Sequence, residues 1–529
     1  MAAEREAGST SVESDEQPIV VHPPRTGDHD GDLVAVETQP APAHPRAEIE
    51  PFAGEGPVAE PAEAGAARER AAGLDAFRGL FLLAMNFAFT IPFGVFAQWM
   101  YHIQFPSPEG DFAPIAGLGW RDTLFGGFLF AMAAALPITM GARLAKGVPY
   151  PGILWIAAKR AFLLFVFALI IGHVNPYWTG DYTKTGNVMA IVGFVVCFWL
   201  FTRPRATWDP AKFKWFRRAG WAAAAALLFL GPTIYDASFS LERRDDIIAS
   251  IAFSALAGTT VWLATRRNLL ARTAVVAAVL ALKLAAREPG WVQTFWSDSP
   301  LPWLFQPWYI ELLLIVIPGT IVGDLLVRWM RPPTPGDAKL TWSGYRLTWL
   351  ALIAASFVPV LLVGTYTRYT ATTTLVVAAL ALGGALLARP ARTGRERVLA
   401  GIFAWGAFWL LLGMLLEPFE GGIKKVPQTL SYLFVSAGLS SMILLACVIV
   451  ADAFGHGRRL LRPLVEVGQN PMLAYVVYML GLNHLLYLLG IGDFLTGSAT
   501  EATIRGFLIA GVVSALVWAA SRARLYWRA

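Results

Sequence analysis

Long apolar stretches follow one another closely from Phe77 to the end of the chain. Each is about 20 residues long, the length that a helix needs to cross the hydrocarbon core of a bilayer. Backbone groups in lipid must be hydrogen-bonded internally, and the short alternating segments of a barrel are missing, so helices are predicted. The predicted spans are residues 77–100, 121–142, 153–173, 187–202, 219–235, 247–265, 269–287, 309–329, 346–366, 370–388, 398–416, 428–453, 471–490 and 503–521.

The loops between these spans alternate in charge. The segment 203–218 carries six basic residues, whereas the segment 102–119 carries no Lys or Arg. Basic loops stay on the cytoplasmic side of a membrane, so the alternation predicts that both termini are cytoplasmic. Loss of one of the two short pairs, 247–287 or 346–388, would give twelve spans and leave the termini unchanged. The prediction is an all-α, polytopic membrane bundle of about 12–14 transmembrane helices.

Composition divides the 529 residues into two parts. Hydrophobic residues make up 56% and charged residues 15%, well below the roughly 25% charged residues of soluble domains. Residues 1–70 carry a net charge of −10 and are predicted to be a disordered acidic tail, with a docking role left open. Residues 71–529 carry +16, which basic loops explain without nucleic acid. Cys197 and Cys447 lie in apolar spans, so no disulfide or cysteine metal site is expected.

Several polar side chains fall at the predicted outer ends of the spans. They include His102, His173, Asp122 and Asp181, together with Glu417, Glu420, Lys424 and Lys425 in one loop. Polar groups near membrane depth are costly and often functional, and a His beside a carboxylate is suited to general-base catalysis. The alternative is that each His simply lies at headgroup depth. No metal-binding or nucleotide-binding motif occurs in the membrane domain, and no metal is predicted.

Four sequence blocks resemble the heparan-alpha-glucosaminide N-acetyltransferase family of transmembrane acyltransferases. The stretch GLDAFRGLFLLAM (73–85) resembles its S-[VL]-D-x-x-R-G opening, and GLGWRDTLFGGFLFAM (117–132) resembles its G-L-T-x-x-D-L-x-F-P segment. Residues 421–441 are similar to the I-x-x-N-K-x-L-W-T-x-S-Y segment, with Lys425 on the motif lysine. Residues 468–478 are similar to G-x-N-x-[IL]-x-x-Y, with Asn470 and Tyr475 in place.

The chain also departs from this family at informative positions. Phe112 stands where the family has a histidine in the outer loop, and Gly126 replaces a motif proline. The expected Asn of the first span falls on Phe89, although Asn86 lies about one turn earlier. His102 would replace the missing histidine only if the loop between the first two spans folds back on itself.

The resemblance implies acetyl transfer across the membrane. Acetyl-CoA would be the co-substrate, and an extracytoplasmic sugar or an envelope glycan or lipid would be the acceptor. His102 and Asp122 would be catalytic, with Asp122 orienting the base, and Lys425 would meet the negative charge of the donor or of the oxyanion. The remaining expected substrate-binding or donor-binding residues are Asn470, Asn86, His173 and Asp181.

Other functions fit the same sequence features. One alternative is a membrane transporter or carrier on this scaffold without acyltransferase chemistry, and another is a membrane scaffold or sensor that uses the acidic tail. The Ala-rich and Arg-rich composition, without an organelle signal, indicates the plasma membrane of a bacterium. The expected partners are the lipid bilayer and a glycan or lipid-linked acceptor, and a homodimer is left open.

Overall fold

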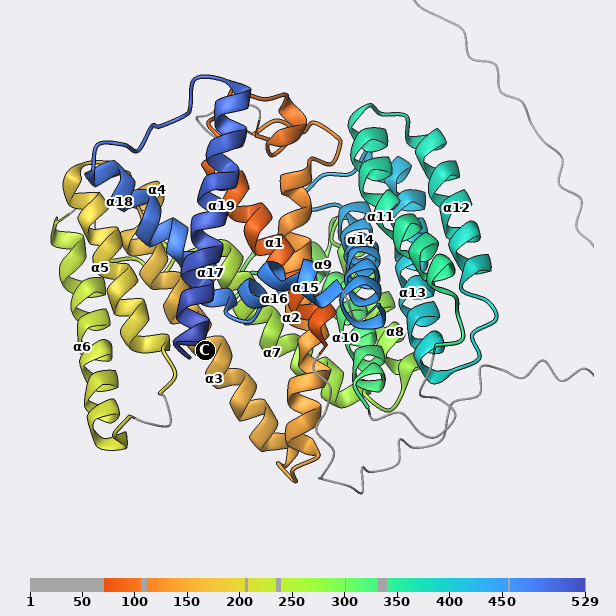
Figure 1. The fold of residues 1–529 in the computed structure, drawn as a ribbon, viewed down its shortest axis with the longest axis horizontal. Coiled ribbons are helices and arrows are strands. Elements are labelled where there is room, and N and C mark those ends of the chain that lie inside the picture. The colour runs from red at the N-terminus through yellow and green to blue at the C-terminus, as the bar shows by residue number, and fades with distance from the viewer. Residues whose placement is uncertain are drawn as a thin grey trace, which may run out of the picture. The chain divides into compact units, whose positions relative to one another are not determined.

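The protein is an all-helical membrane bundle in its computed structural model (Figure 1). The structure describes residues 71–105, 112–204, 208–234, 239–299, 301–331, 340–454 and 457–528, so the predicted acidic tail 1–70 lies outside the described residues. Within these ranges the chain forms no β-sheet, and its one isolated β-bridge joins Thr202 to Trp527. The predicted fold class is confirmed.

Fourteen long helices coincide with the fourteen predicted spans. They are α1 (Ala72–Thr90), α2 (Trp120–Leu144), α3 (Tyr150–Val174), α5 (Lys184–Phe201), α6 (Pro210–Ile234), α7 (Asp246–Thr265), α8 (Leu269–Ala285), α10 (Leu313–Trp329), α11 (Gly344–Tyr366), α12 (Thr370–Leu387), α13 (Gly394–Leu416), α14 (Leu430–Val448), α17 to α18 (Pro471–Val476 and Asn483–Leu488) and α19 (Ala499–Arg522). The short elements are η1 (Gln98–Met100), α4 (Pro176–Thr179), α9 (Trp291–Ser297), η2 (Pro307–Leu312), η3 (Glu417–Glu420), α15 (Gly457–Leu460), α16 (Arg462–Gly468) and the π-helices η4 (Ile449–Ala453) and η5 (Val477–Leu482).

Twelve of these helical segments are long and apolar enough to span a membrane, among the residues that the structure describes. The exceptions are α6, which starts with a basic turn, and α8, which has 17 residues. Both nevertheless connect opposite ends of the bundle. Helix α6 follows the Thr202 bridge and leads to Phe239, which stacks on His173 at the far end of α3. The last turn of α8 carries Lys283, which pairs with Glu311 at the start of the α10 span.

The first predicted span is displaced from the observed helix. It was predicted over 77–100, whereas α1 covers Ala72–Thr90. The backbone N–H groups of Ala72 and Gly73 donate to the Asp452 carboxylate, which caps the helix five residues before the predicted start. Pro92 follows the last turn and favours an extended residue before it, so the helix ends there.

Helix α14 is the centre of the bundle. Almost every side chain from Leu430 to Val448 is buried, while α12 leaves large apolar side chains exposed on the surface of the bundle. Small residues bring the neighbouring backbones close to α14. A Cβ on Gly126 of α2 would lie 2.6 Å from the Cβ of Ser436, and one on Gly438 would lie 2.6 Å from the backbone N of Leu410 in α13. The glycine that departs from the family pattern therefore allows α2 to approach α14.

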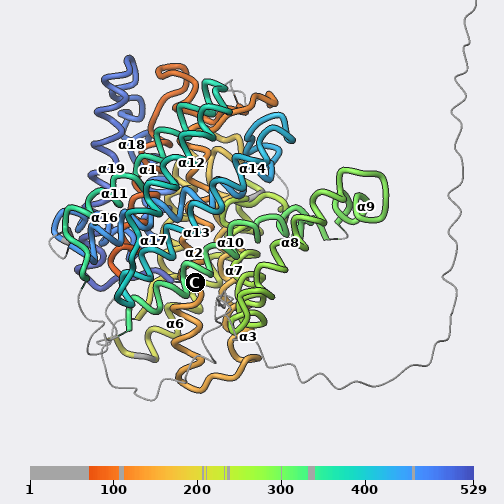
Figure 2. Tube along the Cα trace, turned by 90° about the vertical axis from the view of Figure 1, so that its right-hand side faces the viewer, coloured from red at the N-terminus to blue at the C-terminus, as the bar shows by residue number. Residues whose placement is uncertain are grey.

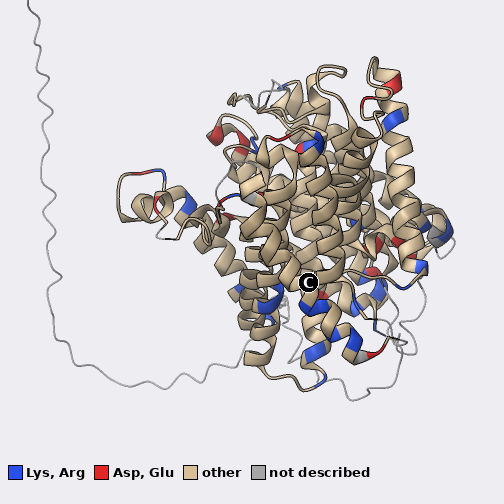
Figure 3. Ribbon diagram, turned by 90° about the vertical axis from the view of Figure 1, so that its left-hand side faces the viewer, with Lys and Arg blue, Asp and Glu red and all other residues tan. Residues whose placement is uncertain are grey.

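The two ends of the bundle differ in charge. Figure 3 shows Lys and Arg positions of the ribbon gathering at the lower end of the bundle, where α2 finishes and α3 and α6 begin. The opposite end carries the loops around η1 and η3. In Figure 2, α8 leads to α9, which stands apart from the other helices with Trp291 and Phe295 exposed. The charged end and the loop end each contain a candidate site.

Candidate active site

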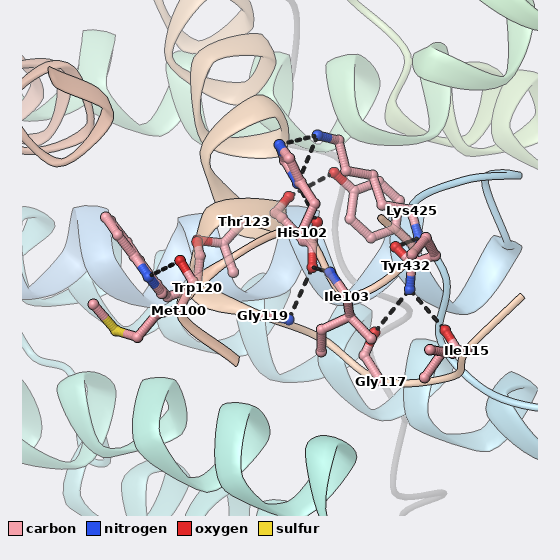
Figure 4. A network of polar contacts seen from close by, with 12 residues as sticks. Met100, His102, Ile103, Ile115, Gly117, Gly119, Trp120, Thr123, Lys425 and Tyr432 are labelled. Atoms are coloured by element: carbon pink, nitrogen blue, oxygen red, sulfur yellow. Dashed lines mark hydrogen bonds and ion pairs between the residues drawn. The ribbon is translucent and has the colours of Figure 1, made fainter. Parts of the chain in front are cut away.

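His102 and Asp122 form a hydrogen-bonded pair at the loop end of the bundle (Figure 4). His102 follows η1, and Asp122 lies in the first turn of α2. The Asp122 Oδ2 accepts a hydrogen bond of 2.9 Å from the backbone N–H of Gly119, so the carboxylate that caps the helix is held at its start. The other oxygen, Oδ1, is 2.6 Å from His102 Nδ1. The carboxylate is buried, while 28% of the imidazole surface is exposed.

Lys425 completes what we call the His102 cluster, made of His102, Asp122 and Lys425. Its Nζ lies 3.4 Å from Nδ1 and 3.5 Å from Nε2 of His102. Lys425 belongs to the loop between η3 and α14, more than 300 residues after His102 in the chain. The three residues predicted for the reaction centre are therefore neighbours in space, although their roles stay predictions.

The loop that carries His102 does fold back. The backbone N–H of Ala113 donates to the Gln104 carbonyl at 2.9 Å, which returns the chain toward His102. The Gln104 side chain is buried and bridges two loops, because Nε2 donates to the Ile115 carbonyl and Oε1 accepts from the backbone N–H of Lys425. Phe112, at the position of the family's histidine, is 48% exposed. Sequence reasoning missed Gln104, since no motif signals a residue whose role depends on this fold-back.

The electrostatics keep the imidazole neutral. The pKa of His102 is lowered to about 4, mainly by burial and also by the positive charge of Lys425, while the hydrogen bond to Asp122 opposes both. Burial also lowers the pKa of Lys425 to about 8, against the attraction of Asp122. At neutral pH the Nδ1–H of His102 thus donates to Asp122, which leaves the Nε2 lone pair to accept a proton. Lys425 remains mostly charged beside it.

Charged residues hold the Lys425 loop in place. Glu420 accepts hydrogen bonds from the backbone N–H groups of Leu430 and Ser431 at the start of α14, at 2.9 and 2.7 Å. Arg287 pairs with the same carboxylate at 2.5 Å. From the other side, Lys283 donates to the Gln428 carbonyl at 2.6 Å. The sequence placed Glu420 in this loop, but its role as a cap of α14 depends on the tertiary structure.

A cavity of about 820 Å³ occupies the opposite, basic end of the bundle. Its lining includes residues of α1, α2, α3, α5, α6, α7 and α17 and of the chain segments 202–204 and 527–528, and much of it is apolar. Seven of the lining residues are basic and one, Asp75, is acidic. The basic residues are Arg78, Arg143, Lys159, Arg160, Arg203, Arg217 and Arg528. We call this the basic cavity.

The basic cavity extends toward the His102 cluster but does not reach it. On α2 the lining residues run from Arg143 to Phe128, which is six residues after Asp122. At 1.5 Å per residue this corresponds to about 9 Å along the helix axis. Phe81 packs against Phe128 with a ring-centroid distance of 6.3 Å, so aromatic side chains lie at this level of α1 and α2.

The four blocks that carry the family resemblance meet at these two places. Asp122 from the second block and Lys425 from the third form the His102 cluster. Asp75 and Arg78 from the first block and Tyr475 from the fourth line the basic cavity. Blocks far apart in the sequence thus converge in pairs at the two ends of the membrane domain.

Asn470 and Tyr475 have different surroundings. Asn470 is fully buried, and its side chain holds the C-terminal segment: Nδ2 donates to the Leu525 carbonyl at 2.9 Å, and Oδ1 accepts from the Trp527 N–H at 3.0 Å. Tyr475 lines the basic cavity and donates through its hydroxyl to Asp245 at 2.8 Å. Asn470 therefore helps to shape the basic cavity indirectly, because it holds the backbone of Trp527, and Trp527 lines the cavity.

The polar contacts of the other predicted binding residues lie elsewhere. Asn86 donates to the carbonyls of Leu82 and Ala474 inside the bundle. His173 is hydrogen-bonded to the Leu169 carbonyl and stacks on Phe239. Asp181 accepts from the Thr183 N–H in a turn. None of the three lines the basic cavity, and their binding roles stay predictions.

The fold and these sites define a polytopic helical membrane protein with a partly buried His–Asp–Lys cluster at one end and a basic cavity at the other. The profile of a family described as "Domain of unknown function (DUF5009)" matches residues 70–326. The match includes His102, Asp122 and much of the cavity lining, and it ends before Lys425 and Asn470. The comparison with curated proteins found no match.

Proposed function

We propose that this protein is an integral-membrane acyltransferase that moves an acetyl group from acetyl-CoA to a sugar or envelope glycan or lipid on the far side of the membrane. The observation that carries the proposal is the His102 cluster. A partly exposed neutral imidazole, 2.6 Å from a buried carboxylate and 3.5 Å from an ammonium group, has the parts that acyl transfer requires.

In this mechanism His102 is the general base. Its Nε2 removes the proton from a hydroxyl or amine of the acceptor as that atom attacks the thioester carbonyl. The new C–O or C–N bond forms, the C–S bond breaks, and the proton passes from His102 to the departing thiolate. Asp122 holds the imidazole through Nδ1 and stabilises the imidazolium that forms. Lys425 stabilises the negative charge that develops on the carbonyl oxygen.

The basic cavity supports an anionic donor at the other end of the bundle. A coenzyme thioester carries several phosphate charges, and guanidinium groups bind phosphate through charge-assisted hydrogen bonds. The positive-inside rule assigns this basic end to the cytoplasm and the His102 cluster to the outside. The proposal places the protein in a bacterial plasma membrane, where it takes the donor from the cytoplasm. The aromatic side chains between cavity and cluster, Phe81 and Phe128, must then move to let the acetyl group pass.

The proposal is tested by transfer of labelled acetyl groups from acetyl-CoA to envelope material by the purified full chain. We expect His102→Gln to lower the rate roughly 10²- to 10⁴-fold, the usual contribution of a general base. Lys425→Met should lower it roughly 10²-fold or more, as the loss of an oxyanion partner does. Lys424→Met is the matched control, one residue away, and should keep the wild-type rate.

Two results would count against the proposal. Wild-type transfer by a folded His102→Gln variant would remove the general base from the mechanism. A thermal unfolding temperature that acetyl-CoA does not raise would exclude it as a ligand, because binding to the native state must stabilise it. Binding without transfer to any acceptor would favour the alternative, a transporter or carrier on the same scaffold.

A further inference from the structure

Two backbone segments pair beside the basic cavity and form the one β-bridge among the described residues. Thr202 and Trp527 form an antiparallel bridge. On one side of it the Arg203 N–H donates to the Tyr526 carbonyl, and on the other the Arg528 N–H donates to the Phe201 carbonyl, both at 2.9 Å. We call residues 201–203 and 526–528 together the clasp. It fixes two arginines on neighbouring extended segments.

The clasp forms one wall of the cavity and presents polar groups to it. Thr202, Arg203 and Arg528 are lining residues. Thr202 is 1% exposed, and its hydroxyl oxygen has no hydrogen-bond partner among the described residues. Buried hydroxyl groups are nearly always hydrogen-bonded, so an unpaired one at a cavity wall indicates a ligand contact.

The basic residues around the clasp favour binding of an anion. Arg160 lies close enough to Arg78, Arg143 and Arg203 for their like charges to interact. The cavity lining holds seven basic residues and one acidic residue, Asp75, which pairs with Arg78 at 3.2 Å. Like charges gathered at a low-dielectric wall repel one another, and an anionic ligand relieves that repulsion.

We infer that the clasp is a phosphate-binding subsite of the basic cavity. The guanidinium groups of Arg203 and Arg528 donate charge-assisted hydrogen bonds to phosphate oxygens, and the Thr202 hydroxyl donates a third. The ligand is a phosphate ester whose uncharged remainder lies along the apolar lining of α3 and α7. The identity of that ester as a coenzyme A thioester rests on the proposed function, whereas the subsite itself does not.

The test measures binding to the purified full-length chain with three probes. Coenzyme A supplies a soluble phosphate ester, pantetheine is its phosphate-free part, and phosphatidic acid in nanodiscs of uncharged lipid supplies a phosphate headgroup. We compare the wild type with Arg203→Gln, Arg528→Gln and Thr202→Val. Arg524→Gln is the control, because Arg524 is exposed and lies outside the cavity lining.

Each arginine variant should weaken binding of the phosphate probe roughly 10- to 100-fold, the effect of one hydrogen bond to a charged group. Thr202→Val should weaken it several-fold, and pantetheine binding should not change. Arginine-dependent binding of phosphatidic acid but not of coenzyme A would keep the subsite and refute the proposed donor. Equal affinity of the wild type and a folded Arg203→Gln, Arg528→Gln double variant for both phosphate probes would overturn the subsite.

Discussion

Replacing Lys425 with Met should raise the pKa of His102. The Lys425 ammonium lies 3.4 Å from Nδ1 of the imidazole, and its positive charge opposes protonation of the ring. Methionine has a similar length and no charge, so it fills the same space. The backbone N–H of residue 425 can still donate to Gln104, which keeps the loop in place. The change therefore isolates the charge.

The magnitude follows from Coulomb's law. Two unit charges 3.4 Å apart interact by about 5 kcal/mol at an effective dielectric constant of about 20, and by about 1 kcal/mol in water. The imidazole is 28% exposed and burial is the largest cause of its low pKa, so the smaller figure is the better guide. Since 1.36 kcal/mol equals one pKa unit, the pKa of His102 should rise by about one unit, from about 4 to about 5.

Modification by diethyl pyrocarbonate measures the pKa of His102 without knowledge of the acceptor, because the reagent reacts with an imidazole in its neutral form and not in its protonated form. Mass spectrometry of the His102 peptide gives the modification rate as a function of pH. The midpoint should be near pH 4 in the wild type and in the Lys424→Met control, and about one unit higher in Lys425→Met. An unchanged midpoint in folded Lys425→Met would refute the electrostatic coupling between the two side chains.

Three further predictions concern stability, each measured by thermal unfolding in detergent. The unfolded chain binds a proton at His102 below pH 6.5, whereas the folded chain binds it only near pH 4. The free energy of unfolding should therefore fall by up to about 3 kcal/mol as the pH drops from 6.5 to 4. His102→Gln should flatten this pH dependence, and an equal slope in both proteins would contradict the prediction. Gly126→Ala should cost about 1–3 kcal/mol, because its Cβ would lie 2.6 Å from Ser436, whereas Gly511→Ala meets no atom within 4 Å and should not destabilise. Asn470→Leu should cost about 1–3 kcal/mol by leaving the Leu525 carbonyl and the Trp527 N–H without their partner, and an unchanged melting temperature would show that the C-terminal segment does not depend on Asn470.

The helices follow directly from the sequence, because the backbone N–H and C=O groups of each span must hydrogen-bond to one another in lipid. Every predicted span coincides with a helix, and errors are confined to ends such as that of α1, where the Asp452 cap comes from a distant part of the chain. The π-helix at Val477–Leu482 was not predicted either, since one extra residue in a turn leaves the hydropathy of the span unchanged.

The sequence alone determined the class of protein, the positions of its helices and the residue types that chemistry would need. A run of apolar residues is a local property, and lipid leaves it few structures to adopt. Tertiary structure decided which polar residues meet. His102 reaches Asp122 because the loop folds back through Gln104, and Lys425 joins them because α14 packs on α2 at Gly126. The basic cavity likewise exists only where segments from distant parts of the chain meet, and its clasp pairs residues more than 300 positions apart. Such contacts depend on packing between helices, which hydropathy along one chain segment does not record.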